Sequence, residues 1–428
     1  MADVPIPAVA AGRAKGGYRS YEVYQRMRVH ETTPLLKPRQ LSSDGYLRDP
    51  FSIVAIVRDN YPCYRDWPAN VFWITGYDDV TSVFVDDANF ETRTKRWRYG
   101  REGWAHDFGD AVPVRAAITR FADEHAERIA CDLISQMVEG STRDLAIEFC
   151  AYFPVRLLRE LLGLSLLDEE RFASAFFTAQ RGVGYEPLAR QAGLRALDDL
   201  GELLRTQTNV EATEYLAAIK ALGGSTDDVV ATLLEADHQT LHGSLANMWS
   251  LLLTDPDQFE AVRSNSRLLK YAYVESLRHS PPVISADRFA RHEVERFGRL
   301  LPDGALLRCS SAAANRDPRI FARPDEFIIA RKDLCQREPR GSYRADGLAS
   351  GISFGTGAPS KHPAIPEDRP RSAYALTRDL AVTASLVLLE AAPGLRLRNG
   401  AVPERRSLRL GELHTCWSLP VDLGPTTS

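Results

Sequence analysis

An aspartate, a threonine and a serine share one side of an expected helix near the middle of this 428-residue chain. At about 100° per residue, Asp237, Thr240 and Ser244 fall on the same side of that helix. A buried carboxyl group with a raised pKa, beside a hydroxyl group, can act as a general acid or base. Such a carboxylate can instead bind a polar group of a ligand or pair with an arginine, and we favour this second interpretation. Asp237 and Thr240 are nevertheless the candidate catalytic residues.

A second side of the same helix carries Glu235, His238 and His242. Two histidines four residues apart on a helix can share a metal ion. The HxxxH spacing alone is a weak signal, because surface and packing histidines show it more often. We therefore expect no metal site here.

A carboxylate and a guanidinium three residues apart occur in Glu275-Ser276-Leu277-Arg278, where they can pair on one helical face. This segment is followed by the run Ala312 to Pro318, AAANRDP, and then by Gly351 to Pro366, GISFGTGAPSKHPAIP. In this order and spacing the three segments resemble the C-terminal half of a bacterial cytochrome P450. The resemblance implies that Glu275 and Arg278 form a buried, structural charge network with Arg331 or its neighbourhood.

The glycine turn Phe354-Gly355-Thr356-Gly357 opens the loop that, by resemblance, supplies the cysteine thiolate for haem iron. This chain has Lys361 where the family has that cysteine. Imidazole is a good iron ligand and a deprotonated lysine can be one, so haem bound through Lys361 or His362 is an alternative. The flanking residues Pro359 and Pro363 remove backbone donors that support the thiolate in the family.

The resemblance also bears on Arg288 and on the central helix. Arg288 stands at the position where the family has an arginine that contacts a haem propionate. An equal alternative is that Arg288 forms a salt bridge at the edge of a strand. The family pattern A-G-x-[D/E]-T is matched by Ala236 and Thr240, but Asp237 replaces the glycine and Gln239 replaces the acid. By resemblance Asp237 faces the pocket, where an unpaired carboxylate costs several kcal/mol. Compared with the family, both the space for dioxygen and the proton relay are therefore altered.

The expected architecture is mainly α-helical with small β-sheets, a cytochrome P450-like fold. Residues 1–45 are expected to form a poorly ordered arm with one short helix near Tyr21–Arg28, and residues 46–428 a single domain. Residues 91–112 mix basic and aromatic side chains, and we interpret them as a solvated loop over a pocket rather than a nucleic-acid site. Helices are expected at 51–58, 116–138, 145–162, 169–180, 188–206, 225–253, 271–279 and 377–390, with strands at 71–75 and within 395–422.

Composition favours an ordinary globular protein, with 44% hydrophobic and 26% charged residues. A net charge of −4 gives no electrostatic case for nucleic acid or an anionic membrane. No apolar run approaches the roughly 20 residues of a membrane helix, and no signal peptide is apparent. The six scattered cysteines indicate reduced thiols. We expect a cytoplasmic protein.

These observations predict a haem-free P450-like protein that binds a small organic molecule. Degenerate relatives of this kind resemble the partner proteins that activate glycosyltransferases in bacterial natural-product pathways. We therefore expect no cofactor, with haem as the alternative, and a partner such as a glycosyltransferase or another biosynthetic enzyme. Two other functions remain open: a cofactor-independent isomerase or cyclase that uses Asp237, and a haem oxidoreductase with His or Lys ligation.

Overall fold

The computed structural model describes Leu36 and residues 40–67, 69–139, 143–184, 186–207, 213–236, 238–339, 341–354, 370–408 and 412–424. This part of the chain is mainly helical with small β-sheets, as the sequence predicts. Its helices are η2 (Gln40–Ser42), α2 (Asp44–Arg48), α3 (Pro50–Asn60), α4 (Tyr77–Phe84), α5 (Lys95–Tyr99), α6 (Val112–Glu139), the π-helix η3 (Leu145–Ala151), α7 (Tyr152–Leu161), η4 (Leu166–Asp168), α8 (Glu169–Arg181), α9 (Pro187–Gln207), α10 (Glu214–Ala221), α11 (Thr226–Glu235), α12 (His238–Thr254), α13 (Pro256–Ser264), α14 (Leu268–His279), α15 (Ser311–Ala314) and α16 (Ala373–Ala391).

The largest sheet has five strands in the order β1-β2-β7-β4-β3. Strands β2 and β7 are parallel, and the other neighbours in this sheet are antiparallel. Two-stranded ribbons pair β5 with β6, β8 with β9, β10 with β13 and β11 with β12. The strands are β1 (Tyr64–Asp66), β2 (Val71–Ile74), β3 (Phe90–Glu91), β4 (Ala286–Ala290), β5 (Val294–Arg296), β6 (Arg299–Leu301), β7 (Leu306–Cys309), β8 (Arg344–Ala345), β9 (Leu348–Ala349), β10 (Arg396–Leu397), β11 (Glu404–Leu408), β12 (Leu413–Ser418) and β13 (Val421–Asp422).

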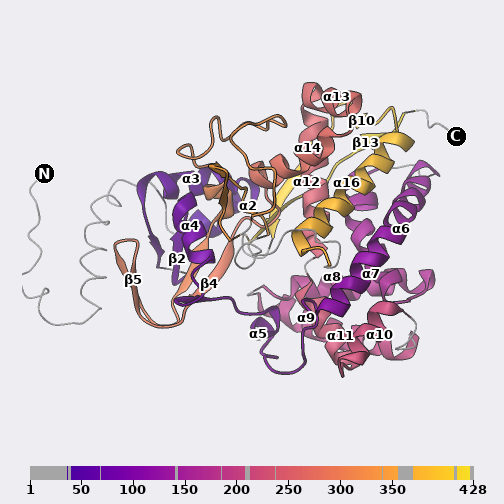
Figure 1. The fold of residues 1–428 in the computed structure, drawn as a ribbon, viewed down its shortest axis with the longest axis horizontal. Coiled ribbons are helices and arrows are strands. Elements are labelled where there is room, and N and C mark those ends of the chain that lie inside the picture. The colour runs from indigo at the N-terminus through magenta and orange to yellow at the C-terminus, as the bar shows by residue number, and fades with distance from the viewer. Residues whose placement is uncertain are drawn as a thin grey trace, which may run out of the picture.

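The main sheet is covered on both faces, which explains why every residue of β2 is buried. Trp73 packs with the apolar side chains of α3, and Phe72 packs with those of α4. Figure 1 shows this sheet with α3 and α4 on one side of the molecule and most of the helices on the other.

Helix α12 lies in the core of the helical side, where it contacts α14, α16 and η3. Trp249 on α12 is fully buried, and its indole N–H donates to the Ser385 hydroxyl of α16 at 3.1 Å. The large apolar side chains around Trp249 supply most of the driving force for packing these helices.

Most of the expected elements are confirmed within two to four residues. Ser225 caps α11 in a capping box with Asp228, as the sequence indicates. Helix α10 was not expected, because residues 207–224 show little periodicity. Of the expected N-terminal arm, the described part includes the buried Leu41 and the start of α2. The short helix expected near Tyr21–Arg28 lies outside the described residues.

Candidate functional site

The central helix is divided into two elements. We expected one helix from Ser225 to about Leu253, and this is wrong, because α11 ends at Glu235 and α12 begins at His238. Ala236, between them, has extended backbone angles (φ −61°, ψ 122°). The predicted catalytic residue Asp237 lies outside the described residues.

Two side chains, one buried and one half-buried, explain why α11 ends there. The side-chain amide nitrogen of Gln180 donates to the carbonyl oxygens of Leu233, Leu234 and Ala236 at 3.3, 3.1 and 2.9 Å. The ammonium group of Lys95 donates to the carbonyl of Glu235 at 3.2 Å and to the Gln180 side-chain oxygen at 3.1 Å. The last carbonyls of a helix need such partners, and here side chains from α8 and α5 supply them.

The two hydroxyl groups expected beside Asp237, those of Thr240 and Ser244, lie in different surroundings. Thr240 is half-buried in the first turn of α12. Ser244 is fully buried, and its hydroxyl donates to the carbonyl of Leu241 and accepts from the phenol of Tyr273 at 3.3 Å. Ser244 therefore links α12 to α14.

Glu235 and His242 of the expected stripe each have partners of their own, and the side chain of His238 lies outside the described residues. The Glu235 carboxylate accepts from the backbone N–H groups of Lys95 and Arg96, both at 3.1 Å, at the start of α5. His242 packs edge-on against Trp417, with ring centroids 5.3 Å apart, and burial lowers the pKa of its imidazole to about 4. Among the described residues, no group of three or more His, Cys, Asp or Glu side chains is placed to hold a metal ion.

Glu275 and Arg278 are fully buried and form two hydrogen bonds, at 2.8 and 2.7 Å. The guanidinium of Arg331 also donates to the Glu275 carboxylate, at 3.1 Å. Arg278 further donates to the backbone carbonyls of Asn315, Pro324 and Glu326. These bonds fasten α14 to the segments that lead into the glycine loop.

Phe354 is the last described residue before the glycine loop. It has a positive φ of 63° and packs against Tyr374 of α16, with ring centroids 6.1 Å apart. The predicted loop residues Gly355, Gly357, Lys361 and His362 lie outside the described residues.

Arg288 is almost fully buried in β4. Its guanidinium lies over the ring of Phe84, 4.5 Å from the centroid, and donates to the carbonyl of Asp287 at 2.9 Å. Both contacts hold the side chain against the main sheet and α4.

None of the six cysteines lies in the loop that, by resemblance, would supply a thiolate for haem iron. Residues 351–366 contain no cysteine. Burial raises the pKa of the Cys63 and Cys309 thiols to about 12 and that of Cys416 to about 11. A thiol with such a pKa is protonated at neutral pH when no metal ion is bound to it.

The segment between β3 and α6 differs from the solvated loop that we expected. Residues 92–109, which we call the strap, contain the helix α5 and are bonded to α11 at both ends. Near the start, Glu235 binds the first N–H groups of α5. Near the end, the N–H groups of His106 and Phe108 donate to the side chains of Asp228 and Thr232, at 2.6 and 3.0 Å.

The basic side chains of the strap have partners within the protein. Arg93 lies over the ring of Phe289 at 4.0 Å, and Arg101 pairs with Asp198 at 3.0 Å. Arg98 binds both oxygens of Glu412, at 2.7 and 2.9 Å. The sequence could not reveal these contacts, because the partners lie up to 314 residues away.

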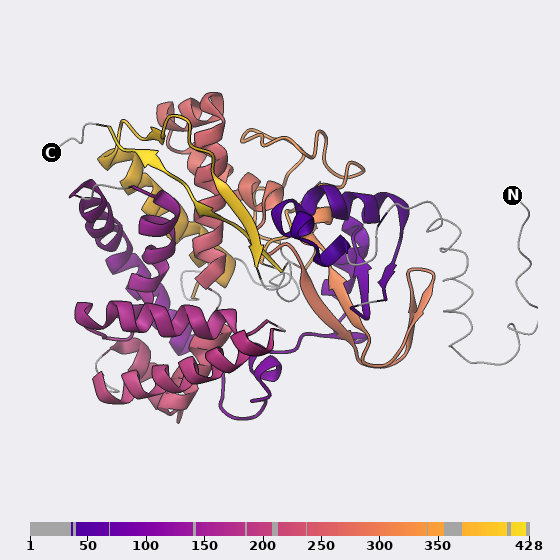
Figure 2. The ribbon, with the colours of Figure 1, turned by 180° about the vertical axis from the view of Figure 1, so that it is seen from behind.

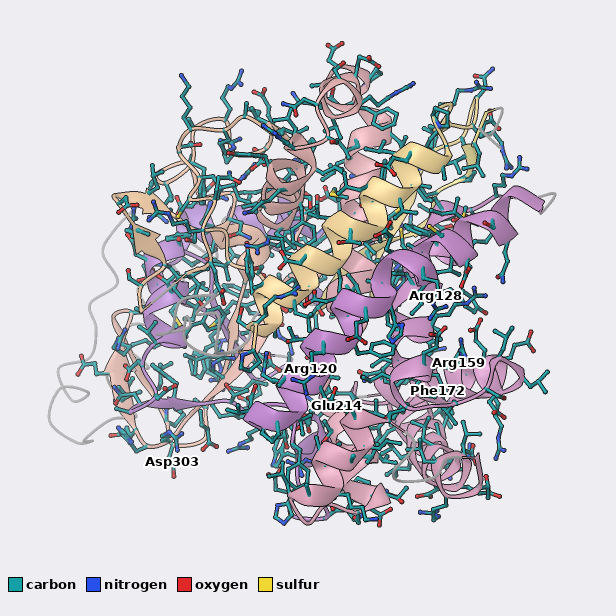
Figure 3. All side chains as sticks on the ribbon, turned by 45° about the vertical axis from the view of Figure 1, so that its right-hand side comes forward. Arg120, Arg128, Arg159, Phe172, Glu214 and Asp303 are labelled. Atoms are coloured by element: carbon teal, nitrogen blue, oxygen red, sulfur yellow. The ribbon has the colours of Figure 1, made fainter. Side chains whose placement is uncertain are left out.

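A surface groove of about 270 Å³ lies among α6, α7 and α10, away from the helix break. Three carboxylates line it, from Glu124, Glu160 and Glu214. Figure 3 shows Arg120 and Glu214 together at this surface, where they form an exposed ion pair. Of the predicted site residues that the structure describes, none lines this groove.

Comparisons with curated proteins place the chain among cytochromes P450, although no family model matches it. Pulcherriminic acid synthase of Bacillus subtilis is 25% identical over 349 residues, 74% of this chain and 84% of that protein. The 6-deoxyerythronolide B hydroxylase of Saccharopolyspora erythraea is 27% identical over 363 residues, 74% of this chain and 86% of that protein. Cytochrome P450 107B1 of the same organism is 31% identical over 216 residues, 48% of this chain and about half, 53%, of that protein.

Solved structures share the fold. The cytochrome P450 PksS of the Bacillus subtilis bacillaene polyketide synthase superposes with a TM-score of 0.69, at 20% identity, over 90% of this chain and 100% of that one. Ligand-free cytochrome P450 TbtJ1 superposes with a TM-score of 0.68, at 20% identity, over 87% of this chain and 96% of that one.

These findings correct one expectation. We expected the chain to hold no cofactor, and this is wrong, because the relatives are cytochromes P450, which are haem proteins, and they point to haem. Residues 351–366 contain no cysteine that could supply a thiolate for it. None of the helices in the described part of the chain has the length and apolar character that crossing a bilayer requires. From the matched relatives and the shared fold, the chain belongs to the cytochrome P450 superfamily.

Proposed function

We propose that this P450-fold protein binds a small organic molecule and acts as an auxiliary of a partner enzyme in natural-product biosynthesis. A glycosyltransferase is the partner class that we favour. One observation carries the proposal: Lys361 stands where the family has the cysteine of the haem loop. Thiolate-supported oxygen activation therefore lacks its ligand.

The altered central helix supports the same conclusion. Gln180 and Lys95 donate hydrogen bonds to the carbonyl groups at the end of α11. The next residue in the sequence is Asp237, at the position where the family has a glycine. The strap is hydrogen-bonded to this end of the helix through the Glu235 carboxylate. These features are better suited to binding a small molecule than to admitting dioxygen to a metal centre.

The auxiliary role is tested by adding the purified protein to a natural-product glycosyltransferase from the same organism. The transferase alone should be slow or unstable, and its rate should rise with the concentration of this protein until it saturates. An Asp237→Asn variant should activate equally well if the chain does no acid–base chemistry. A transferase whose rate and stability do not change would contradict the proposal.

A second candidate is a haem oxidoreductase whose iron is bound by nitrogen. The haem-protein relatives favour it. Neutral His362 or deprotonated Lys361 would be the ligand, and haem would supply redox chemistry when bound. Oxidation of a small molecule that requires haem, in the absence of any partner, would favour this candidate over the auxiliary role.

A further inference from the structure

Helix α9 has a glycine, Gly193, well inside its span of Pro187–Gln207. Glycine is less favourable than alanine in a helix interior, so its presence there needs a physical reason. A Cβ atom on Gly193 would overlap the phenol oxygen of Tyr99 and would lie 3.0 Å from the Cα atom of Gly182. The close approach of α5 and α8 therefore requires glycine at this position of α9.

Gly182, directly after α8, is the other wall of the same space. A Cβ atom there would also overlap the Tyr99 phenol oxygen, and it would lie 2.7 Å from the carbonyl oxygen of Ala189. We call the space between Gly182 and Gly193 the glycine notch. Tyr99 of α5, only 3% exposed, fills this notch, and its O–H group donates to the carbonyl oxygen of Ala179. The last carbonyls of a helix have no helical donor, so Tyr99 supplies one at the end of α8.

The ends of α5, α8 and α11 are joined by hydrogen bonds in a closed cycle. Tyr99 of α5 donates to α8, and Gln180 of α8 donates to the last carbonyls of α11. The Glu235 carboxylate of α11 accepts from the backbone N–H groups of Lys95 and Arg96 at the start of α5. Figures 1 and 2 both show α5 beside the ends of α8 and α9. Each of the three helix ends therefore obtains a hydrogen-bond partner from another helix of the three.

We propose that Tyr99 is the positioning residue for the break between α11 and α12. Ala179 directly precedes Gln180, so the bond from Tyr99 fixes the backbone that carries the Gln180 side chain. The same contact holds α5 against α8, which brings Lys95 within reach of Gln180 and of the end of α11. Because the glycine notch admits the tip of one aromatic ring, it sets the distance between the strap and the α8–α9 pair.

The consequence for a ligand rests on the proposed function. A small molecule that binds beside the end of α11 would meet Gln180 and Lys95 at the positions that Tyr99 gives them. The placement of these side chains needs neither a ligand nor a partner enzyme. Unfolding and hydrogen exchange of the protein alone test it, so its failure is distinguishable from failure of the auxiliary role.

Thermal unfolding of glycine variants tests the fit of Tyr99 in the notch. Gly193→Ala should lower the melting temperature by several degrees, because overpacking a filled space destabilises the fold. Gly201→Ala, also inside α9, is the matched control. Its Cβ atom would meet the flexible end of Arg205 at 3.2–3.5 Å, so the melting temperature should stay the same or rise.

Shortening the side chain in the notch should make room for the added methyl group. In a Tyr99→Leu background, Gly193→Ala should therefore lower the melting temperature by less than about half as much as it does in the unchanged protein. An equal cost in both backgrounds would show that Tyr99 does not fill the notch.

Hydrogen exchange tests whether Tyr99 acts on the ends of α5 and α11. Tyr99→Phe keeps the ring but removes the donor to Ala179, and the amides of Lys95 and Arg96 should exchange about tenfold faster. Tyr215→Phe, at a buried tyrosine of the same apolar cluster, is the control and should leave these two amides unchanged. Equal acceleration in α14 and α16 would indicate a general loss of stability and would contradict a positioning role. Unchanged exchange at Lys95 and Arg96 would contradict it as well.

A double variant tests whether the effect passes through Gln180. Tyr99→Phe and Gln180→Leu disturb the same set of helix ends, so the second substitution should lower the melting temperature less than it does alone. Tyr99→Phe combined with Arg120→Gln, at an exposed ion pair, should give the sum of the two single shifts. Additive shifts for Tyr99→Phe and Gln180→Leu would mean that Tyr99 only packs locally and would overturn the proposal. If Gly193→Ala or Tyr99→Leu does not fold, the measurements on Tyr99→Phe still decide the question.

Discussion

The side-chain nitrogen of Gln180 on α8 lies 2.9 Å from the carbonyl oxygen of Ala236, just beyond the end of α11. This bond, with those to Leu233 and Leu234, takes the place of the helical N–H groups that would have continued the helix. Gln180 is almost fully buried. One buried amide therefore stabilises the break at the candidate site.

Replacing Gln180 by Leu should destabilise the fold, because three buried carbonyls lose their donor. The expected loss in the free energy of unfolding is about 1–3 kcal/mol, measured by urea denaturation. Gln191→Leu, on the exposed face of α9, is the matched control and should change stability by less than about 0.5 kcal/mol. Equal effects of the two substitutions would mean that Gln180 does not hold the break.

The Glu275 network should be the most sensitive part of the core. Glu275→Ala leaves Arg278 and Arg331 buried without their shared carboxylate, and we expect a loss of about 3–5 kcal/mol in the free energy of unfolding. Glu260→Ala removes an exposed partner of Arg263 and should cost less than about 1 kcal/mol. A folded Glu275→Ala variant with unchanged denaturation would refute a structural role for this network.

His242 should make stability depend on pH. Burial lowers the pKa of this imidazole to about 4, whereas an unfolded histidine titrates near pH 6.5. Between these values the unfolded chain binds the proton and the folded chain does not. The free energy of unfolding therefore falls as the pH drops from about 6.5 to 4, by on the order of 3 kcal/mol for this group.

Urea denaturation of His242→Leu at pH 7 and pH 5 tests this assignment. The variant should lose less stability between the two pH values than the unchanged protein does. His414, whose pKa burial also lowers to about 4, keeps part of the dependence. Gln191→Leu, which changes no titratable group, is the control and should keep the full dependence. An unaltered pH dependence in His242→Leu would contradict a neutral, buried imidazole.

The sequence predicted the fold better than the site. Glu275 and Arg278, with the run from Ala312 to Pro318, identified the superfamily because these residues brace one another in the core. The break after Glu235 could not be predicted, because its cause is Gln180, more than fifty residues earlier. The strap was misread as a solvated loop for the same reason. Its basic residues look solvent-exposed in sequence, and only the fold brings Glu235 and Glu412 to them.

If haem is bound, the loop sequence predicts a nitrogen ligand. His362→Ala or Lys361→Ala, whichever removes the ligand, should alter the visible spectrum of haem-loaded protein or abolish haem retention. The other substitution should leave the spectrum unchanged. Two variants with the parent spectrum would place the ligand elsewhere in the chain.

We propose that haem bound to this P450-fold protein would have no thiolate ligand. The most direct measurement is the absorption spectrum of the reduced protein under carbon monoxide, after expression with excess haem precursor. We predict a spectrum without the red-shifted Soret band that thiolate-ligated haem gives. That band, in the protein as purified, would contradict the account and restore oxygen activation as the function.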